Sequence, residues 1–246
     1  MIHTFILGYS GAQYFSEWHP QVKFGEDIKF YYIDNGQQNL TPYLNKMLTH
    51  QSSKNLFCSG GWNLICDIAF DSFNLDKIII GQEDAIFTDE ILREIDNQTN
   101  STQICGTYDR SFEFSLFGIH KDIFKNIGRF DENFILGGNE DNDYKQRCKL
   151  KNTTILSLNI PADFNLSLTG NERSKYNNIN SLYLHEKWGN HSNEIHKIYE
   201  YEQPFNNKKI NHITEEYKNY FDIKEENSNF MSELEYKLYK NKNKQV

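Results

Sequence analysis

The sequence predicts an α/β protein with a mostly parallel central sheet and helices on both of its faces. Short apolar runs typical of buried strands alternate along the chain with stretches whose apolar residues have helical spacing. At 246 residues the chain is long enough for one such domain with an appendage. Aromatic residues make up 15% of the chain, so we expect Phe and Tyr to form much of the core.

The first half of the chain begins this alternation. Each expected strand is short and apolar, and the β-branched run 78–80 is the strongest of them. The expected strands are 3–7, 28–33, 56–58 and 75–80, and the expected helices are 41–47 and 62–73. Thr41 is a suitable N-cap for the first helix, with Pro42 at its first position.

The second half continues the pattern. Thr88 suits the N-cap of a helix that has Asp89 and Glu90 in its first turn, where acids favour the positive end of the helix dipole. A polar loop follows at 97–103. The remaining expected elements are strands at 104–106, 112–118 and 153–160 and helices at 121–127 and 139–149.

The composition changes near the C-terminus. From about residue 190 the chain is rich in Asn, Lys, Glu and Tyr, and 229–240 shows an amphipathic helical stripe. We therefore expect one domain over 1–205 and a helical C-terminal extension over 206–246. The extension packs on the domain or on a partner, and the sequence leaves open a homodimer, a membrane-surface contact or neither.

The bulk composition excludes some classes of protein. The net charge is −8, whereas a nucleic-acid groove needs clustered Lys and Arg. The sequence contains no run of about 18 apolar residues, so it predicts no transmembrane helix. The N-terminus lacks the basic leader of a signal peptide, and the four cysteines show no Cys-x-x-Cys spacing. These features predict a cytoplasmic protein with reduced thiols.

Acidic residues follow two of the expected strands. Asp34 has a simple turn explanation, because Asn-Gly follows it, and an alternative in which it accepts hydrogen bonds from a nucleobase or ribose. Asp84 is either a solvated loop acid or a ligand for Mg²⁺ or Mn²⁺. Because the carboxyl ends of parallel strands meet at one edge of a sheet, the two acids could converge there.

A second acidic cluster opens the helix expected at 139–149. In one interpretation its acids stabilise the positive end of the helix dipole. In the other, a carboxylate at the lip of a cleft is catalytic, and Gly137 and Gly138 let the backbone approach a ligand closely.

Taken in order, these motifs resemble a glycosyltransferase of the GT-A fold (nucleotide-diphospho-sugar transferase, Rossmann-like), close to the large family 2 group of inverting enzymes. The resemblance covers roughly residues 1–205. Its pieces are Ile-Asp-Asn-Gly at 33–36, Gly-Gly-Trp-Asn and a later Asp within 60–67, the segment 78–88 with Gln-Glu-Asp at 82–84, the segment 117–134 that ends in Gly-Arg-Phe-Asp-Glu-Asn-Phe, Gly-Gly-Asn-Glu-Asp-Asn-Asp-Tyr-Lys-Gln-Arg at 137–147 and Lys-Trp-Gly at 187–189.

The resemblance implies a nucleotide-sugar pocket at the ends of the first strands. Asp34 would lie near the base, and Tyr9 and Ser10 would line the same pocket. Asp67 falls where the family often has a polar residue on the nucleotide side. Lys187 and Trp188 match a segment near the acceptor or the phosphates.

The resemblance also implies a metal and a catalytic base. Gln82, Glu83 and Asp84 match the Asp-x-Asp metal motif, with Asp84 as the ligand for Mn²⁺ or Mg²⁺. Glu140 and Asp141 match the Glu-Asp pair, with Asp141 as the base. Two positions depart from the family, because Gln82 replaces the first acid and Asn165 stands where a histidine is common. Whether a metal is strictly required therefore stays open.

The leading hypothesis is an inverting glycosyltransferase of glycan biosynthesis. It would move a sugar from a UDP- or GDP-type donor to a hydroxyl of a glycan acceptor. One alternative is a catalytically weak or inactive transferase-like module that binds glycan or nucleotide, given the departures at Gln82 and Asn165. A nucleotidyltransferase is a further alternative, although 9–13 contains no Lys or Arg to bind a triphosphate.

Aromatic side chains offer a separate choice between core and ligand. Trp62, Phe114 and Trp188 could stack on a sugar face, or they could be core residues, which is the commoner role for large aromatic side chains.

Overall fold

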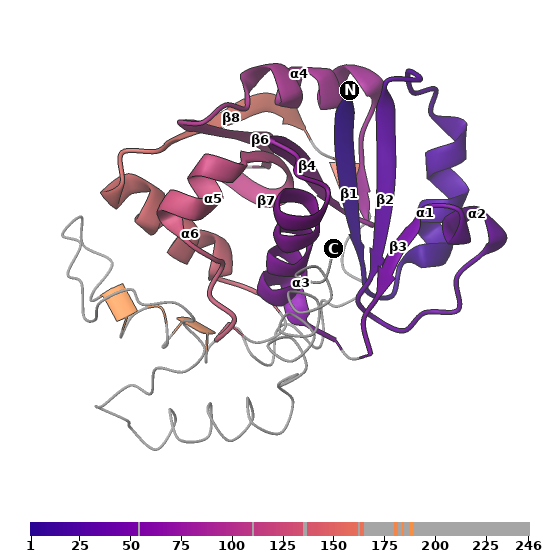
Figure 1. Cartoon of the computed structure of the whole chain (residues 1–246), viewed down its shortest axis with the longest axis horizontal. Coiled ribbons are helices and arrows are strands. Elements are labelled where there is room, and N and C mark those ends of the chain that lie inside the picture. Colours follow the sequence, from indigo (N-terminus) through magenta and orange to yellow (C-terminus); the bar gives the residue numbers. More distant parts are fainter. Residues whose placement is uncertain are drawn as a thin grey trace.

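The chain forms a central sheet covered by helices on both faces (Figure 1). The computed structural model describes residues 1–53, 55–109, 111–134, 137–161 and 163–164, together with Asn180, Ser181, Leu184, Lys187 and Trp188. The predicted extension at 206–246 and Asn165 lie outside the described residues. No helix within the described ranges is long and apolar enough to cross a membrane.

Seven strands form the central sheet in the order β3-β2-β1-β4-β7-β6-β8. All pair in parallel except β7, which is antiparallel to β4 and β6. The strands are β1 (Ile2–Gly8), β2 (Ile28–Asp34), β3 (Leu48–Gln51), β4 (Lys77–Gln82), β6 (Gln103–Asp109), β7 (Ser111–His120) and β8 (Thr154–Pro161). A small second sheet pairs β5 (Ala85–Ile86) with β9 (Asp163–Phe164). The mostly parallel sheet expected from the sequence is confirmed.

The helices divide between the two faces of the sheet. They are α1 (Ala12–Trp18), α2 (Pro42–Asn45), α3 (Phe57–Cys66), α4 (Asp89–Gln98), α5 (Lys121–Ile127) and α6 (Glu140–Leu150). A short 3₁₀ turn, η1 (His19–Gln21), follows α1, and a π-helical turn, η2 (Asp67–Ser72), continues α3. The N-caps expected at Thr41 and Thr88 are confirmed, because each hydroxyl accepts a backbone N–H of its helix.

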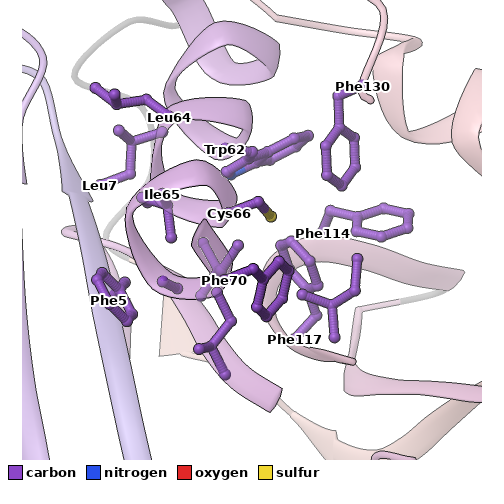
Figure 2. Packing of buried hydrophobic residues seen from close by; sticks show 14 of the residues in the cluster. Phe5, Leu7, Trp62, Leu64, Ile65, Cys66, Phe70, Phe114, Phe117 and Phe130 are labelled. Atoms are coloured by element: carbon purple, nitrogen blue, oxygen red, sulfur yellow. The ribbon is translucent and has the colours of Figure 1, made fainter. Parts of the chain in front are cut away.

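Each face has its own hydrophobic core, because successive side chains of a strand point to opposite sides. Phe5 and Leu7 of β1 pack with α3, α5 and α6, and Figure 2 shows Trp62 and Phe130 in the same cluster. Ile6, between them, packs with α1, α2 and α4 on the other face. The core is rich in aromatic residues, as the composition predicted.

One strand prediction is wrong. Residues 56–58 do not form the third strand, because Phe57 already begins α3, and the third strand is the polar segment Leu48–Gln51 at the sheet edge. Gly61 of helix α3 packs closely on β1. A Cβ atom on Gly61 would lie 2.6 Å from Leu7 Cδ1, so any larger residue there would force the Leu7 side chain to move.

Candidate functional site

A pocket opens at the carboxyl ends of β1 and β4, the edge at which open parallel sheets bind ligands. Its cavity volume is about 90 Å³, and the cavity is open to solvent on one side. The lining residues come from four segments and are Leu7, Tyr9, Ser10, Asn35, Asn55, Phe57, Cys58, Gln82, Glu83 and Asp84. We call this cavity the donor pocket, after the nucleotide-sugar donor that the sequence resemblance implies here. It contains five of the residues predicted to bind a nucleotide sugar or a metal, and none of its described lining residues is Lys or Arg.

Asp34 lies beneath this pocket and is fully buried. Its carboxylate accepts the backbone N–H groups of Gly36 (3.0 Å) and Gln38 (2.9 Å), and the Gln51 amide donates to it at 2.6 Å. The turn interpretation explains the two backbone contacts, and the Gln51 contact ties the turn to β3. Gly36 lets the turn pack on the β1 loop, because a Cβ atom there would lie 1.6 Å from the Tyr9 carbonyl oxygen.

Two asparagines shape the wall of the pocket at the start of α3. Asn35 is buried, and its side chain accepts the N–H of Leu56 (2.7 Å) and donates to the carbonyl of Phe57 (3.1 Å). The side-chain Oδ1 of Asn55 accepts the backbone N–H of Phe57 at 2.8 Å. These bonds hold Phe57 at a φ of 58°, a strained conformation for a bulky residue that persists only where its surroundings fix it.

Glu83 is buried and its carboxylate is surrounded by donors. One oxygen accepts the backbone N–H groups of Tyr9 and Ser10 at 2.7 Å each, and also that of Gly11. The other accepts the hydroxyl of Tyr32 at 2.6 Å. The structure thus directs this carboxylate toward the chain's own backbone.

Asp84, the next residue, is half-buried on the pocket wall, beside the half-buried Gln82. A carboxylate and an amide oxygen are hard oxygen donors of the kind that Mg²⁺ and Mn²⁺ prefer. No cluster of three or more His, Cys, Asp or Glu suited to a metal occurs in the described part of the chain. A cation here would therefore need oxygen atoms from its ligand as well.

The start of α6 is the second candidate region. Gly137 and Gly138 have φ angles of 146° and 111°, and Asn139 is left-handed at 73°, so this tight entry into the helix depends on the glycines. Glu140 is buried, and its carboxylate accepts the N–H of Gly138. Asp141 is 23% exposed and pairs with Lys145 one turn along the helix, with Oδ2 and Nζ 2.9 Å apart.

A buried ionic network lies behind this helix start. Nζ of Lys187 lies 2.6 Å from an oxygen of Asp131 and 2.6 Å from an oxygen of Asp143, and all three side chains are at most 1% exposed. Arg147 pairs with the other oxygen of Asp143 at 2.8 Å, and the Trp188 indole donates to Asp143 at 2.9 Å. Lys187 and Trp188, predicted to bind the nucleotide sugar, thus bind α6 and the 128–134 segment instead of lining the donor pocket.

Asp67 also lies outside the donor-pocket lining. It sits at the end of α3 opposite to the pocket and forms a buried pair with Arg129, with contacts of 2.7 and 2.9 Å. Burial raises the pKa of Asp67 to about 6, although the guanidinium opposes this shift. Its described contacts are those of a structural ion pair.

The aromatic candidates are core residues. Trp62, Phe114 and Trp188 are at most 6% exposed. Trp62 packs on Phe130 with ring centroids 4.9 Å apart, and in Figure 2 its ring points toward Phe130 and away from Leu7.

The two candidate regions meet at Cys58. This half-buried residue lines the donor pocket, and a Cβ atom on Gly137 would lie 3.0 Å from its sulfur. The loop that leads into Glu140 and Asp141 therefore packs against the pocket wall.

The sequence did not predict the structural roles of several residues, namely Asn35, Asn55, Asp131, Asp143 and Arg147. Only the last three belong to a motif that the sequence showed, because the spacing at 128–147 places them around the start of one helix.

Comparisons with known proteins bear on the fold. No family model and no curated protein matches this chain. The crystal structure of GalNAc-T7 with UDP, GalNAc and Mn²⁺ aligns with a TM-score of 0.52 and 8% identity, over 78% of this chain and 48% of that one. The chain has the GT-A fold.

A second solved structure, S. aureus TarS 1–349, aligns with a TM-score of 0.48 and 13% identity, over 66% of this chain and 59% of that one. The chain thus spans between 48% and 59% of the length of these two structures. The donor pocket and the loop before α6 both lie at the N-terminal end of α3, because Cys58 lines the pocket and a Cβ atom on Gly137 would lie 3.0 Å from its sulfur.

Proposed function

We propose that this protein is an inverting glycosyltransferase that moves a sugar from a nucleotide-diphosphate sugar to a hydroxyl group of a glycan acceptor. The observation that carries the proposal is the contact between the wall of the donor pocket, at Cys58, and the loop that precedes Glu140 and Asp141. This contact supports a single site with a donor side and an acceptor side, as sugar transfer requires.

The donor side suits a diphosphate held with a cation. A nucleotide diphosphate is strongly anionic, whereas the described pocket lining contains no Lys or Arg. Asp84 and the amide oxygen of Gln82 would hold Mn²⁺ or Mg²⁺ together with phosphate oxygens. Such an ion would neutralise the charge that develops on the departing diphosphate. Because the GalNAc-T7 structure contains UDP and Mn²⁺, UDP-sugars with Mn²⁺ are the first donors to test.

The acceptor side supplies the base. Glu140 is buried and bound to the backbone of Gly138, so its carboxylate is committed to the loop. Asp141 is partly exposed, and only one of its oxygens pairs with Lys145. The other oxygen of Asp141 can take the proton of an acceptor hydroxyl as that hydroxyl attacks the anomeric carbon from the face opposite the diphosphate. Attack from that face inverts the configuration.

The nucleotidyltransferase alternative gains no support from the donor pocket. Binding a triphosphate in the loop after β1 would require free backbone N–H groups, and those of Tyr9, Ser10 and Gly11 already bind Glu83.

The test combines a donor screen with one substitution. The full chain is incubated with a panel of nucleotide sugars, with and without Mn²⁺, and donor hydrolysis and transfer are measured. We expect Asp141→Asn to lower turnover by about 10²–10⁴-fold, the usual contribution of a general base, while donor affinity stays unchanged.

Asp122→Asn is the matched control, because Asp122 is also an acid in the first turn of a helix. Near-normal turnover of Asp141→Asn would show that Asp141 is not the general base. If no nucleotide sugar binds under any metal condition, the proposed function as a whole is wrong.

A further inference from the structure

We propose that the buried carboxylate of Glu83 is a built-in anion that fixes the shape of the donor pocket and keeps phosphate out of the loop after β1. The first part of this proposal concerns the folded chain alone. The second part rests on the proposed function, since it concerns where a nucleotide diphosphate binds.

The loop after β1 presents three successive backbone N–H groups to a single point. Those of Tyr9, Ser10 and Gly11 all donate to the same oxygen of Glu83, the first two at 2.7 Å. Converging backbone N–H groups of this kind form an anion-binding concavity, which elsewhere receives a phosphate. In this chain the concavity is already filled by a side chain from the end of β4.

The second oxygen of Glu83 links this loop to the next one. It accepts the Tyr32 hydroxyl at 2.6 Å and the Gln38 amide at 3.3 Å. Gln38 also accepts the N–H of Ala12 at 2.8 Å and donates to Asp34 at 3.3 Å. A single carboxylate thus ties together the loops that follow β1 and β2, which form two walls of the donor pocket.

The chain packs tightly beside Glu83. A Cβ atom on Gly8 would lie 2.0 Å from the Tyr32 hydroxyl and 2.7 Å from a Glu83 oxygen. Gly8 is therefore needed for Tyr32 and Glu83 to meet. The arrangement involves β1, β2 and β4 together, so it is a feature of the folded sheet and not of one turn.

This arrangement separates the roles of two adjacent acids. Glu83 is bound by the chain, and Asp84 lies on the pocket wall. A diphosphate excluded from the loop after β1 is directed to the side of Asp84, where a divalent cation can neutralise it. Glu83 is accordingly a positioning residue, and it does not contact the donor.

The first test uses Glu83→Ala in the full chain. Hydrogen exchange of the Tyr9, Ser10 and Gly11 amides, followed by NMR, reports on the loop whether or not the protein is active. We expect these amides to exchange at least about tenfold faster in the variant, because a charge-assisted acceptor of three N–H groups is lost. Millimolar acetate, which can enter the vacated concavity, should restore part of the protection.

Glu26→Ala is the matched control, since Glu26 is exposed and lies in the loop before β2. It should change neither amide exchange nor donor affinity. Unchanged exchange of the three loop amides in Glu83→Ala would overturn the proposal directly.

Glu83→Gln separates a positioning role from direct contact with the donor, and it carries the test if Glu83→Ala fails to fold. Its amide oxygen can still accept the three N–H groups, so we expect a largely protected loop and a donor affinity within a few-fold of wild type. Loss of donor affinity in Glu83→Gln with the loop still protected would show that Glu83 binds the donor itself. If wild type binds no nucleotide sugar, the proposed function fails, and the exchange measurements still decide the first part of the proposal.

Discussion

The end of β4 and the start of α6 are both acidic, yet their buried carboxylates are neutralised in different ways. At the donor pocket, Asp34 and Glu83 are held by amides and a hydroxyl, and within the described residues neither has a basic partner. Behind α6, Asp131 and Asp143 are held by Lys187 and Arg147. The first arrangement depends on local loop geometry, and the second on a residue far along the chain.

The comparison teaches which acids in an acidic motif are available for chemistry. Within each cluster the fully buried acids bind the chain itself. Asp84 and Asp141 are the partly exposed members. These two are the candidates for the donor side and the acceptor side.

The largest effect on stability is expected for Lys187→Met. Removing the ammonium leaves two buried carboxylates that both lie 2.6 Å from its former position, so we expect a loss of about 3–5 kcal/mol of unfolding free energy. Lys145→Met removes the partly exposed pair with Asp141 on α6, the helix that also carries Asp143. This change should cost at most about 1 kcal/mol. Urea unfolding measures both. Equal losses for the two variants would contradict the distinction between the buried network and the surface pair.

The two faces of the sheet should also respond in opposite ways to acid. His19, in the turn η1 after α1, is buried against Phe15 and Phe30, and burial lowers its pKa to about 4. Because the unfolded chain binds this proton more readily, stability from His19 is present above about pH 6.5 and is lost as the pH falls toward 4. The loss is about 3 kcal/mol. His19→Phe removes the titrating group, so its unfolding free energy should fall less between pH 7 and pH 4 than that of wild type. An unchanged slope would show that the folded chain binds the His19 proton as readily as the unfolded chain does.

Asp67, at the far end of α3, should give the reverse dependence. Its pKa is raised to about 6, so the folded chain binds the proton more readily than the unfolded chain does. Its contribution is present below about pH 3.8 and is lost as the pH rises through 6, by about 3 kcal/mol in total. Asp67→Asn should remove this dependence. The slope of unfolding free energy against pH is the measurement, because the variant also weakens the pair with Arg129 and so shifts the stability at every pH. A slope equal to that of wild type would mean that Arg129 cancels the effect of burial on the pKa of Asp67.

A smaller effect than those at Lys187, His19 and Asp67 is expected for Trp62→Phe. The Trp62 indole N–H is buried with no hydrogen-bond partner among the described residues, so its removal partly offsets the cost of the smaller ring. We expect a loss of about 1–2 kcal/mol in urea unfolding and no change in turnover. A large loss of turnover at unchanged stability would show that Trp62 stacks on a sugar of the substrate.

Much of the fold was predictable because hydrophobic periodicity and turn residues are local signals. The strand at Ile78–Ile80 and the caps at Thr41 and Thr88 needed no tertiary information. The strand at Leu48–Gln51 was missed because it is polar and joins the sheet only at its edge, through backbone pairing with β2.

The candidate site was predictable in place but not in detail. The end of the expected strand located Asp84 and its neighbour Glu83. The sequence could not predict which of the two would be bound by the chain itself, because that depends on the turn after β4. The partner of Lys187 was beyond sequence reasoning, because Asp131 lies 56 residues away. A positive charge near an acidic motif looks the same in sequence whether it binds phosphate or a buried carboxylate.

The central claim is that Asp84 and Asp141 serve one pocket, and paramagnetic relaxation by bound Mn²⁺ tests it most directly. With UDP and Mn²⁺ added to the full chain, we predict strong broadening of the amides of Asp84 and of Glu140 to Asn142. We predict no broadening at Asp122, and none at any of these positions in Asp84→Asn. Broadening at Asp84 without broadening at Glu140 to Asn142 would show that the two acidic regions do not share a site.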